Sequence, residues 1–373
     1  MPVAVPGLWR QVSRYMTEKS SPFVIRWRHF PRLLPWLTRF LWAGRSWSAV
    51  ETCARLRFEL CRHTTTEHLR IASEAGVPHL VQQRGLLTVF PDKEAYLSSA
   101  FEWDLRRQLG ISFTEFDHSA LKQLEPSLSH RYQYGVRINE GCHCVDLEAY
   151  CEAIADLLKH RGADFVVAKA TGFRISGSRV TAVMTEVGDV DCSHAVIAAG
   201  IGSSHLARIG GDNVPLESER GYHVVLSDDG ATFRHPIMPY DGKMAITPTL
   251  QGLRVAGQVE LASVASPPDW NRAAILQRFA MTVFSSQSKD HQVVDRWMGH
   301  RPSTPDGLPC IGAASSYANV FHAFGHGHSG LTQAPATGTL IAQMIAGERM
   351  TADARAYSAT RFRRRWITSD KLG

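Results

Sequence analysis

The chain has 373 residues, enough for two domains at the usual size of about 100–200 residues each. Its composition, 44% hydrophobic and 20% charged, can form a sizeable core and excludes a disordered or low-complexity protein. The net charge of +6 is far below the dense basic patterning of a nucleic-acid binder, so we expect no nucleic-acid partner.

The cysteines and the hydropathy pattern indicate a compartment. The seven cysteines have no repeated spacing typical of a disulfide framework, which favours a reducing environment. No stretch reaches the ~18 uninterrupted apolar residues of a membrane span, and MPVAVPGLWRQ lacks the pattern of a signal peptide. We therefore expect a cytoplasmic protein, with a place on the inner face of the plasma membrane as the alternative.

The first 45 residues are rich in Trp, Pro and Arg. Apolar residues recur at helical spacing there, but Pro31 and Pro35 limit the predicted helix to about 35–43, ending at Gly44. A basic, tryptophan-bearing amphipathic segment suits peripheral contact with a membrane surface. The alternative is a helix that covers the core.

Helices and short strands are predicted from there to the middle of the chain. Residues 47–75 predict one long helix, residues 79–90 predict two short strands, and helices are expected up to Leu124. The segment 134–167 predicts a strand, a helix capped by Asp146, and a further strand after a glycine turn.

The second half is predicted to contain more sheet. Residues 173–200 predict a three-stranded meander that leads into a buried strand at 195–197. Between 214 and 298, β-rich runs alternate with turns and predict an antiparallel sheet. The last unit is a strand at 320–325, a glycine-rich loop and a helix over about 333–346.

The strongest chemical signal is AFGHGHSGLTQAPATGTLIAQMIAG, residues 323–347. Gly325, Gly327 and Gly330 let the backbone approach a ligand, and the following helix offers free N–H groups and a positive dipole end. These suit a phosphate or a ring with developing negative charge; the alternative is an ordinary strand-to-helix loop. His326 and His328 lack a nearby carboxylate, so we expect no metal there.

A second signal is RPSTPDGLPCIG, residues 301–312. Arg301 suits bidentate capture of a carboxylate in a desolvated pocket, whereas the alternative is a surface arginine in a proline-rich loop. GCHCVD (141–146) lacks the second Cys/His pair of a zinc site. The absence of a G-x-S-x-G elbow and of a P-loop argues against a hydrolase or a nucleoside-triphosphatase.

Taken in order, these segments resemble the FAD-dependent D-amino acid dehydrogenases and the wider D-amino acid oxidase-like (DAO) family. The resemblance spans nearly the whole chain, through VDLEAYCEAIADLLKHRGADF, VIAAGIGSSHLARIGGDNVPLESERGYHV, AITPTLQGLRVAGQVELA and the two signals above. It implies an α/β fold (α+β overall), with an incomplete FAD-binding Rossmann-like domain, a β-meander, and a substrate domain of antiparallel sheet and helices. The implied parts are 1–140 (substrate domain and connecting helices), 141–215 (FAD-binding), 216–298 (substrate sheet), 299–350 (FAD-binding) and 351–373 (basic tail).

The resemblance also implies roles for particular residues. FAD would contact Ala170, Ala198, Ala199, Gly200, Gly325, His326, Gly327, His328, Gly330, Leu331 and Thr332. Arg301 would grip the substrate carboxylate, with Tyr222, His223 and Tyr240 beside the substrate. The implied reaction is hydride transfer from the α-carbon of a D-amino acid, or a related secondary amine, to the flavin, giving a 2-oxo acid and ammonia. No protein base is required if the amine arrives neutral, and a respiratory-chain acceptor is expected to take the electrons.

One departure from the family concerns the start of the chain. Enzymes of this group open with a strand, a G-x-G-x-x-G turn, a helix and a second strand ending in an acidic residue, and no such module opens this sequence. If Met1 is the true start, we expect weak FAD binding, an exposed sheet edge and poor stability. The alternatives to an active flavoenzyme are a truncated, non-catalytic remnant, or a membrane-surface or partner-binding protein using the basic start and RFRRRW (361–366).

Overall fold

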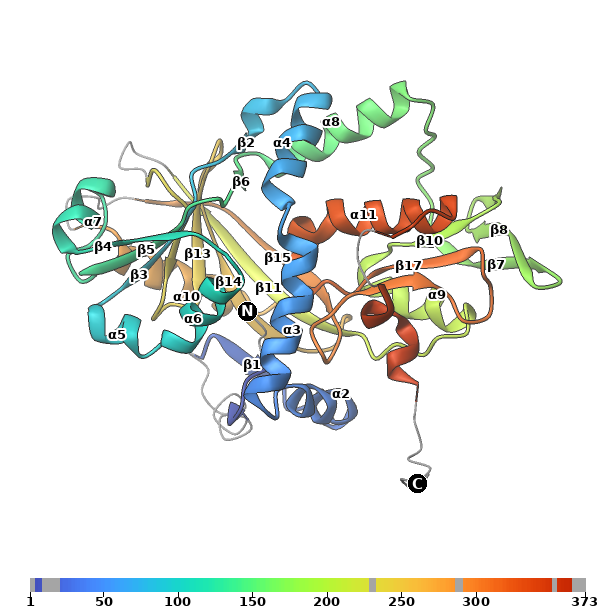
Figure 1. The fold of residues 1–373 in the computed structure, drawn as a ribbon, viewed down its shortest axis with the longest axis horizontal. Coiled ribbons are helices and arrows are strands. Elements are labelled where there is room, and N and C mark those ends of the chain that lie inside the picture. The colour runs from blue at the N-terminus through green and yellow to red at the C-terminus, as the bar shows by residue number, and fades with distance from the viewer. Residues whose placement is uncertain (1–3, 9–20, 228–232, 286–290, 351–353, 364–373) are drawn as a thin grey trace.

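The structure is a computed structural model that describes residues 4–8, 21–227, 233–285, 291–350 and 354–363. The molecule has two main sheets, one of nine strands and one of three strands (β10, Ala195–Ile197; β17, Val320–Phe324; β16, Cys310–Ala313), which lie on opposite sides of it (Figure 1). Helix α3 (Trp47–Cys61) runs between them, and helix α11 (Gly330–Ala346) lies along the smaller one. This arrangement confirms the predicted fold class.

The large sheet has the order β15-β11-β14-β13-β12-β3-β5-β4, with β1 beside β14. Its strands are β1 (Phe23–Ile25), β3 (Leu86–Phe90), β4 (Phe113–Phe116), β5 (Tyr134–Ile138), β11 (Glu217–Leu226), β12 (Ile237–Pro239), β13 (Met244–Thr249), β14 (Gly252–Leu261) and β15 (Val293–Ser303). The predicted antiparallel sheet of the second half is thus confirmed. One face packs on α10 (Asn271–Val283), a helix that the sequence pattern did not predict, through residues such as Val224 and Leu276.

The small sheet contains β10 (Ala195–Ile197), β17 (Val320–Phe324) and β16 (Cys310–Ala313). β10 and β17 are parallel, and β16 is antiparallel to β17. The predicted meander is confirmed as β7 (Ala170–Ser176), β8 (Arg179–Thr185) and β9 (Gly188–Asp191). The meander shares a core with α9 (Ser203–Ile209) and one side of the small sheet. Helices α3 and α11 share a second core with the small sheet.

Two helices differ from the prediction. Helix α2 (Phe30–Ala43) begins before the predicted start, because Pro31 lies in its first turn, where a missing N–H leaves no bond unmade. The single helix predicted over 47–75 is wrong, since α3 ends at Cys61 and α4 (Thr64–Glu74) begins separately. The break falls at Arg62 and His63. In the first turn of α4, the Thr64 hydroxyl donates to the Thr332 carbonyl at 2.7 Å, which ties the start of α4 to α11.

Residues 81–160 also form a small two-stranded sheet and four helices. These are β2 (Val81–Gln82), paired with β6 (His143–Cys144), and helices α5 (Lys93–Leu97), α6 (Ala100–Gln108), α7 (His118–Leu124) and α8 (Leu147–His160). The predicted cap is confirmed, because the Asp146 carboxylate accepts from the amide of Ala149 at 3.1 Å. The strand predicted after Gly162 does not form before β7. Phe165, Val166 and Val167 lie exposed there, without a neighbouring strand to bond their backbone.

The division of the chain between the sheets differs in detail from the predicted boundaries. The boundary at 298/299 falls inside β15, which belongs to the large sheet up to Ser303. The described part of the basic tail forms the short helices η5 (Ala354–Tyr357) and η6 (Ala359–Phe362), with Tyr357 and Ala359 buried. Residues 364–366 of the tail sequence RFRRRW lie outside the described residues. No helix in the described ranges is long and apolar enough to cross a membrane.

Candidate active site

The glycine loop connects β17 to α11 and lies against the end of β15. Its glycines have the spacing G-x-G-x-x-G over 325–330, in the strand–turn–helix context of a dinucleotide-binding turn. Gly325 and Gly327 have φ angles of +87° and +58°. A Cβ on Gly327 would lie 3.0 Å from the Ser303 hydroxyl, and one on Gly325 would lie 3.0 Å from the Thr304 methyl. The loop therefore needs glycine for its backbone shape and for its close approach to β15.

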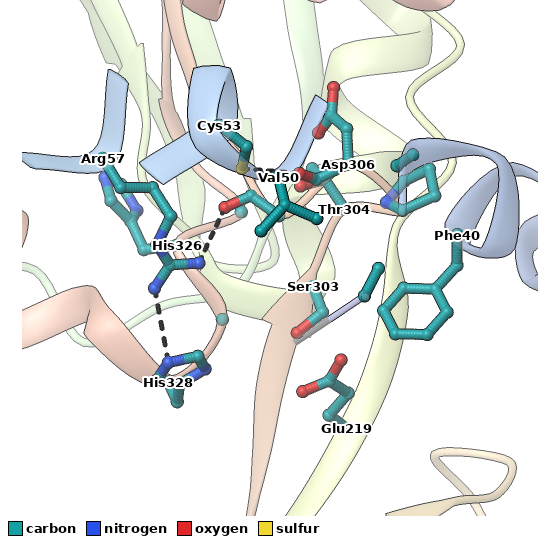
Figure 2. Close-up of a pocket in the computed structure, with 16 residues that line it drawn as sticks. Phe40, Val50, Cys53, Arg57, Glu219, Ser303, Thr304, Asp306, His326 and His328 are labelled. Carbon is teal, nitrogen blue, oxygen red and sulfur yellow. Dashed lines mark hydrogen bonds between the residues drawn. The ribbon is translucent and has the colours of Figure 1, made fainter. Parts of the chain in front are cut away.

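Arg57 of α3 ties this loop to the turn that follows β15 (Figure 2). Its guanidinium donates to the Gly307 carbonyl at 3.0 Å and to the Ser329 hydroxyl at 2.5 Å, and Nη2 lies 3.3 Å from Nε2 of His328. Arg57 was not among the residues predicted for the site. Its signal was a charged residue on the buried stripe of a helix, in register with Val50 and Leu60.

The two loop histidines are held as neutral groups. Nε2 of His326 lies 2.9 Å from the hydroxyl of Thr337 in α11. Burial, with Arg57 adding to it, lowers the pKa of His326 to about 4 and that of His328 to about 3. At neutral pH these rings add shape and hydrogen bonds to the site, not positive charge.

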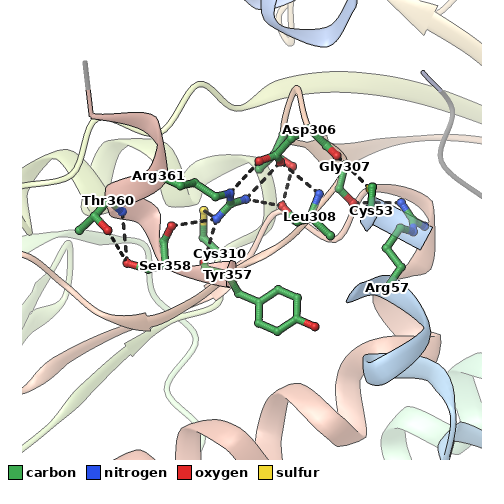
Figure 3. A network of polar contacts seen from close by, with 11 residues as sticks. Cys53, Arg57, Asp306, Gly307, Leu308, Cys310, Tyr357, Ser358, Thr360 and Arg361 are labelled. Carbon is green, nitrogen blue, oxygen red and sulfur yellow. Dashed lines mark hydrogen bonds and ion pairs between the residues drawn. The ribbon is translucent and has the colours of Figure 1, made fainter. Parts of the chain in front are cut away.

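The turn between β15 and β16 is held in place from the C-terminal segment (Figure 3). The Arg361 guanidinium donates to both carboxylate oxygens of Asp306, at 2.7 and 3.2 Å, and to the Leu308 carbonyl at 2.6 Å. Asp306 in turn accepts from the Leu308 amide at 3.1 Å. Because this turn lines the hollow beneath the glycine loop, its shape sets part of the wall of the site.

Arg301 lies in β15 on the face of the large sheet that is turned to the glycine loop. Nη1 donates to the Gln258 carbonyl at 2.9 Å, and a Cβ on Gly221 would lie 2.1 Å from Nη2, so the guanidinium covers Gly221. Burial lowers the pKa of Arg301, and Glu219, its direct partner across the β11–β15 ladder, opposes that shift. Arg301 also helps to lower the pKa of His328 of the loop.

His223 lies in β11, two residues beyond Gly221. Its ring stacks on Trp297 with centroids 5.3 Å apart, and Nδ1 lies 3.3 Å from Nη2 of Arg254. Burial, then Arg254, lowers the pKa of His223 to about 4. Arg254 is a second half-buried arginine of this sheet that the sequence analysis missed, within electrostatic reach of Arg301.

The two tyrosines assigned to the substrate lie elsewhere. Tyr222 points into the core shared with α10, where its hydroxyl donates to Glu260 at 2.6 Å and accepts from the Asp269 amide at 2.9 Å. Tyr240 follows β12 and packs 4.9 Å from the Phe90 ring. β12 is four strands from β15, about 19 Å at ~4.8 Å per strand. Neither tyrosine therefore shares a carboxylate with Arg301 in this structure.

The residues assigned to the ADP half of FAD lie at the edge of the small sheet. Ile197 pairs with His322 in the parallel β10–β17 ladder, so Ala198, Ala199 and Gly200 leave the sheet on the same side as the glycine loop. Ligands of open α/β sheets bind at this carboxyl edge. Ala170 begins β7 and pairs with Thr185. In the part of the chain that the structure describes, β10 has a neighbour on one side only.

Leu331 and Thr332 line a second hollow, with a cavity volume of about 310 Å³. His68 of α4 holds the start of α11 here, with Nε2 at 3.0 Å from the Leu331 carbonyl and Nδ1 at 2.9 Å from the Tyr150 hydroxyl. The hollow extends to Thr247 of the large sheet. The first turn of α11 thus lies between the smaller hollow beneath the glycine loop and this larger one.

The residues present fit a flavin cofactor. The buried hydroxyl of Ser303 lies beside Gly327 and within reach of the Glu219 carboxyl group, where a ligand atom at the loop could also bond it. The N-terminal end of the 17-residue helix α11, with the positive end of its dipole, lies at the junction of the two hollows. Backbone N–H groups at the start of a helix suit the carbonyl oxygens of a flavin ring or a phosphate.

Known proteins match this chain over nearly its whole length. It is 39% identical over 364 residues to the D-amino-acid oxidase of Bradyrhizobium diazoefficiens, covering 97% of this chain and 86% of the relative. A D-amino acid dehydrogenase of Vibrio vulnificus is 26% identical over 354 residues, covering 93% and 84%.

Solved structures with the same fold are more distant in sequence. Glycine oxidase from Bacillus cereus superposes with a TM-score of 0.71 at 22% identity, covering 78% of this chain and 81% of that one. L-proline dehydrogenase from P. horikoshii gives 0.72 at 18% identity, covering 81% and 82%. The model of the family described as FAD dependent oxidoreductase matches residues 14–344. The chain therefore belongs to the FAD-dependent oxidoreductases of the DAO family.

Proposed function

We propose that this protein oxidises D-amino acids, releasing a 2-oxo acid and ammonia. The observation that carries the proposal is Arg301, a half-buried guanidinium that lies flat over Gly221 on the sheet face beside the glycine loop. A guanidinium in such a place suits the carboxylate that every amino acid carries. The names of the Bradyrhizobium and Vibrio relatives support the D configuration.

The chain's own groups would bind and orient the reactants. The glycine loop, Ser303 and the first turn of α11 would hold FAD, which when bound accepts the hydrogen and electron pair of the substrate's Cα–H bond. Arg301 would fix the carboxylate and so orient the α-carbon. The neutral His326 and His328 add no competing positive charge near the carboxylate site.

A flavin titration tests the proposal. The purified protein, supplied with FAD, is expected to be yellow and to lose its flavin absorbance anaerobically on addition of D-alanine or D-proline, whereas L-alanine has no effect. A flavin that D-amino acids leave oxidised would contradict the proposed activity. A well-folded protein that takes up no FAD would instead favour the non-catalytic alternative.

We also propose that the protein contacts the inner face of the plasma membrane and passes its electrons to a respiratory-chain acceptor there. The exposed face of α2 carries Arg32, Leu34, Arg39 and Trp42, with Trp27 exposed just before it. The Trp42 ring, 68% exposed, lies under the Arg45 guanidinium at 4.7 Å. Exposed tryptophans flanked by arginines suit the interface of an anionic bilayer.

Vesicle sedimentation and product analysis test this second proposal. The protein is expected to pellet with vesicles containing phosphatidylserine, less so at high salt, and the pelleted fraction should fall in Trp27→Ala/Trp42→Ala but not in Leu250→Ala, a control at another exposed apolar residue. Reduction of a quinone without hydrogen peroxide would support the respiratory acceptor. Stoichiometric peroxide would contradict it and match the name of the Bradyrhizobium relative.

A further inference from the structure

Glu219 is a buried carboxyl group at the candidate active site that the reaction described above does not use. Its side chain is 5% exposed, and it lies in β11 directly opposite Arg301 of β15. Directly paired residues of an antiparallel ladder point to the same face, with Cβ atoms about 4.5–5.5 Å apart. The pair therefore presents a carboxyl group and a guanidinium side by side.

The Glu219 carboxyl group faces the hollow beneath the glycine loop (Figure 2). The hollow is closed on the opposite side by α3 and by Phe40 of α2. Among the residues that line it, Ser303, Gly327 and His328 come from the part of the site that fits a flavin. Arg301 does not itself line this hollow, but its pairing with Glu219 in the ladder places both side chains on one sheet face. A substrate carboxylate on Arg301 would therefore bring the rest of the molecule next to Glu219.

The charges around Glu219 decide what it can bind. The charged and titratable side chains that face it are Cys53 and Arg57 of α3, Arg301 of β15, Asp306 of the turn, and His326 and His328 of the loop. Asp306 is already paired with Arg361, and burial raises the pKa of the Cys53 thiol to about 11, so it stays neutral. Burial raises the pKa of Glu219, while Arg301, a hydrogen bond from the Ser303 hydroxyl and Arg57 oppose that rise.

We propose that Glu219 receives the α-ammonium group of the amino acid whose carboxylate is bound by Arg301, and accepts a proton from it. The inference rests on the proposed function, and it assigns the site an amine-binding group of its own. A zwitterion carries its two charges on one carbon, and the paired side chains of β11 and β15 offer one charge of opposite sign to each.

The proton step involves no redox change. One N–H bond of the ammonium breaks and an O–H bond forms on the Glu219 carboxylate, leaving a neutral amine whose lone pair is free. That lone pair forms the C=N bond as the hydrogen and electron pair leave the α-carbon for FAD. A carboxyl group with a raised pKa is a better proton acceptor than an ordinary one, because its basicity is closer to that of the amine.

The pH dependence has a definite sign. Glu219 must be ionised to hold the ammonium, so kcat/KM should rise with pH through the raised pKa of this group. The loop histidines stay neutral throughout this range, since they titrate near pH 4 and below. In Glu219→Gln, this rise of kcat/KM should vanish. Its kcat/KM should be lower than that of the wild type and independent of pH in the acidic range.

A binding experiment that needs no turnover separates the ammonium from the carboxylate. Isobutyrate and 2-aminoisobutyrate differ only in the amino group, and neither has an α-hydrogen next to an amine to be oxidised. We expect calorimetry with the FAD-loaded wild type to show about tenfold tighter binding of 2-aminoisobutyrate at pH 8, the size of one hydrogen bond to a charged group. This preference should shrink as the pH falls through the pKa of Glu219.

The variants distinguish amine binding from a purely structural role. Glu219→Gln should lose the preference and keep its affinity for isobutyrate, and Glu219→Asp should keep part of the preference. Glu217→Gln is the matched control, because Glu217 lies on the same strand but bonds His29 at 3.0 Å. Equal affinity of the wild type for both ligands would overturn the inference alone, as would an isobutyrate affinity that falls with Glu219→Gln. Failure of the FAD-loaded wild type to bind either ligand would overturn the proposed function as well.

Discussion

At the scale of single residues, the candidate site depends on two glycines, Gly221 and Gly299, as well as on the side chains that cover them. The Arg301 guanidinium covers Gly221, where a Cβ would lie 2.1 Å from Nη2. Gly299, the partner of Gly221 across the ladder, is covered by the Trp297 ring, 1.8 Å from where its Cβ would be. Two paired glycines thus leave a shallow channel in the sheet, in which a long cation and an indole can lie flat.

Replacement of Arg301 tests its role most directly. Loss of a buried, hydrogen-bonded charge partner costs about 2–5 kcal/mol, so Arg301→Ala should lower kcat/KM by about 30-fold to a few thousand-fold, mainly through KM. Arg301→Lys keeps the positive charge but lacks the planar guanidinium, so its kcat/KM should lie between those of the wild type and Arg301→Ala. The measurement is steady-state kinetics beside a flavin absorbance titration. Equal loss of FAD binding would show that Arg301 is structural instead.

At the scale of elements, the turn after β15 is held from two sides. Arg57 of α3 bonds its Gly307 carbonyl, and Arg361 of η6 bonds Asp306 and the Leu308 carbonyl (Figure 3). Arg361 also donates to the carbonyls of Tyr357 and Ser358 within its own segment. A segment near the end of the chain therefore shapes one wall of a site built mostly from earlier residues.

Removal of Arg361 should destabilise the fold and loosen the cofactor site together. Breaking a largely buried ion pair leaves Asp306 uncompensated, so Arg361→Ala should lower the free energy of unfolding by about 3 kcal/mol and weaken FAD binding. Arg361→Lys should recover part of the stability. Thermal denaturation and FAD titration measure the two effects, with the exposed Arg349→Ala as the control. Unchanged FAD affinity in a destabilised Arg361→Ala would separate the turn from the site.

At the scale of the whole molecule, local signals and tertiary contacts contributed differently to what could be predicted. The positions of Arg301 near a strand end and of the glycine loop before a helix were predictable, since glycines before a helix and an arginine beside a proline turn are local patterns. Glu219 and Arg57 were not, because a charged residue on a buried face signals a ligand hollow only once the other wall is known. Tyr240 was misplaced because the strand order that puts β12 four strands from β15 leaves no mark on local sequence.

Acid sensitivity is a further property of the whole fold. Burial lowers the pKa of six histidines in the described residues: His143, His223, His300, His322, His326 and His328. The unfolded chain protonates them near pH 6.5, whereas the fold binds those protons only at lower pH. The unfolded state therefore holds more protons between these values, so stability is fully present above pH 6.5 and is lost as the pH falls.

We expect Tm to be nearly constant between pH 8 and 7 and to fall steeply between pH 6.5 and 5, with each such histidine adding up to about 1.4 kcal/mol per pH unit. His322→Gln tests one contribution, because an amide can still donate to Asp212, which lies 3.0 Å from Nε2, but does not titrate. His322→Gln should take up about one proton fewer on unfolding, so its Tm should fall less steeply as the pH is lowered. The Tm of the exposed variant His118→Gln should change with pH as that of the wild type does. A wild-type Tm that stays level down to pH 5 would contradict the neutral, buried state of these rings.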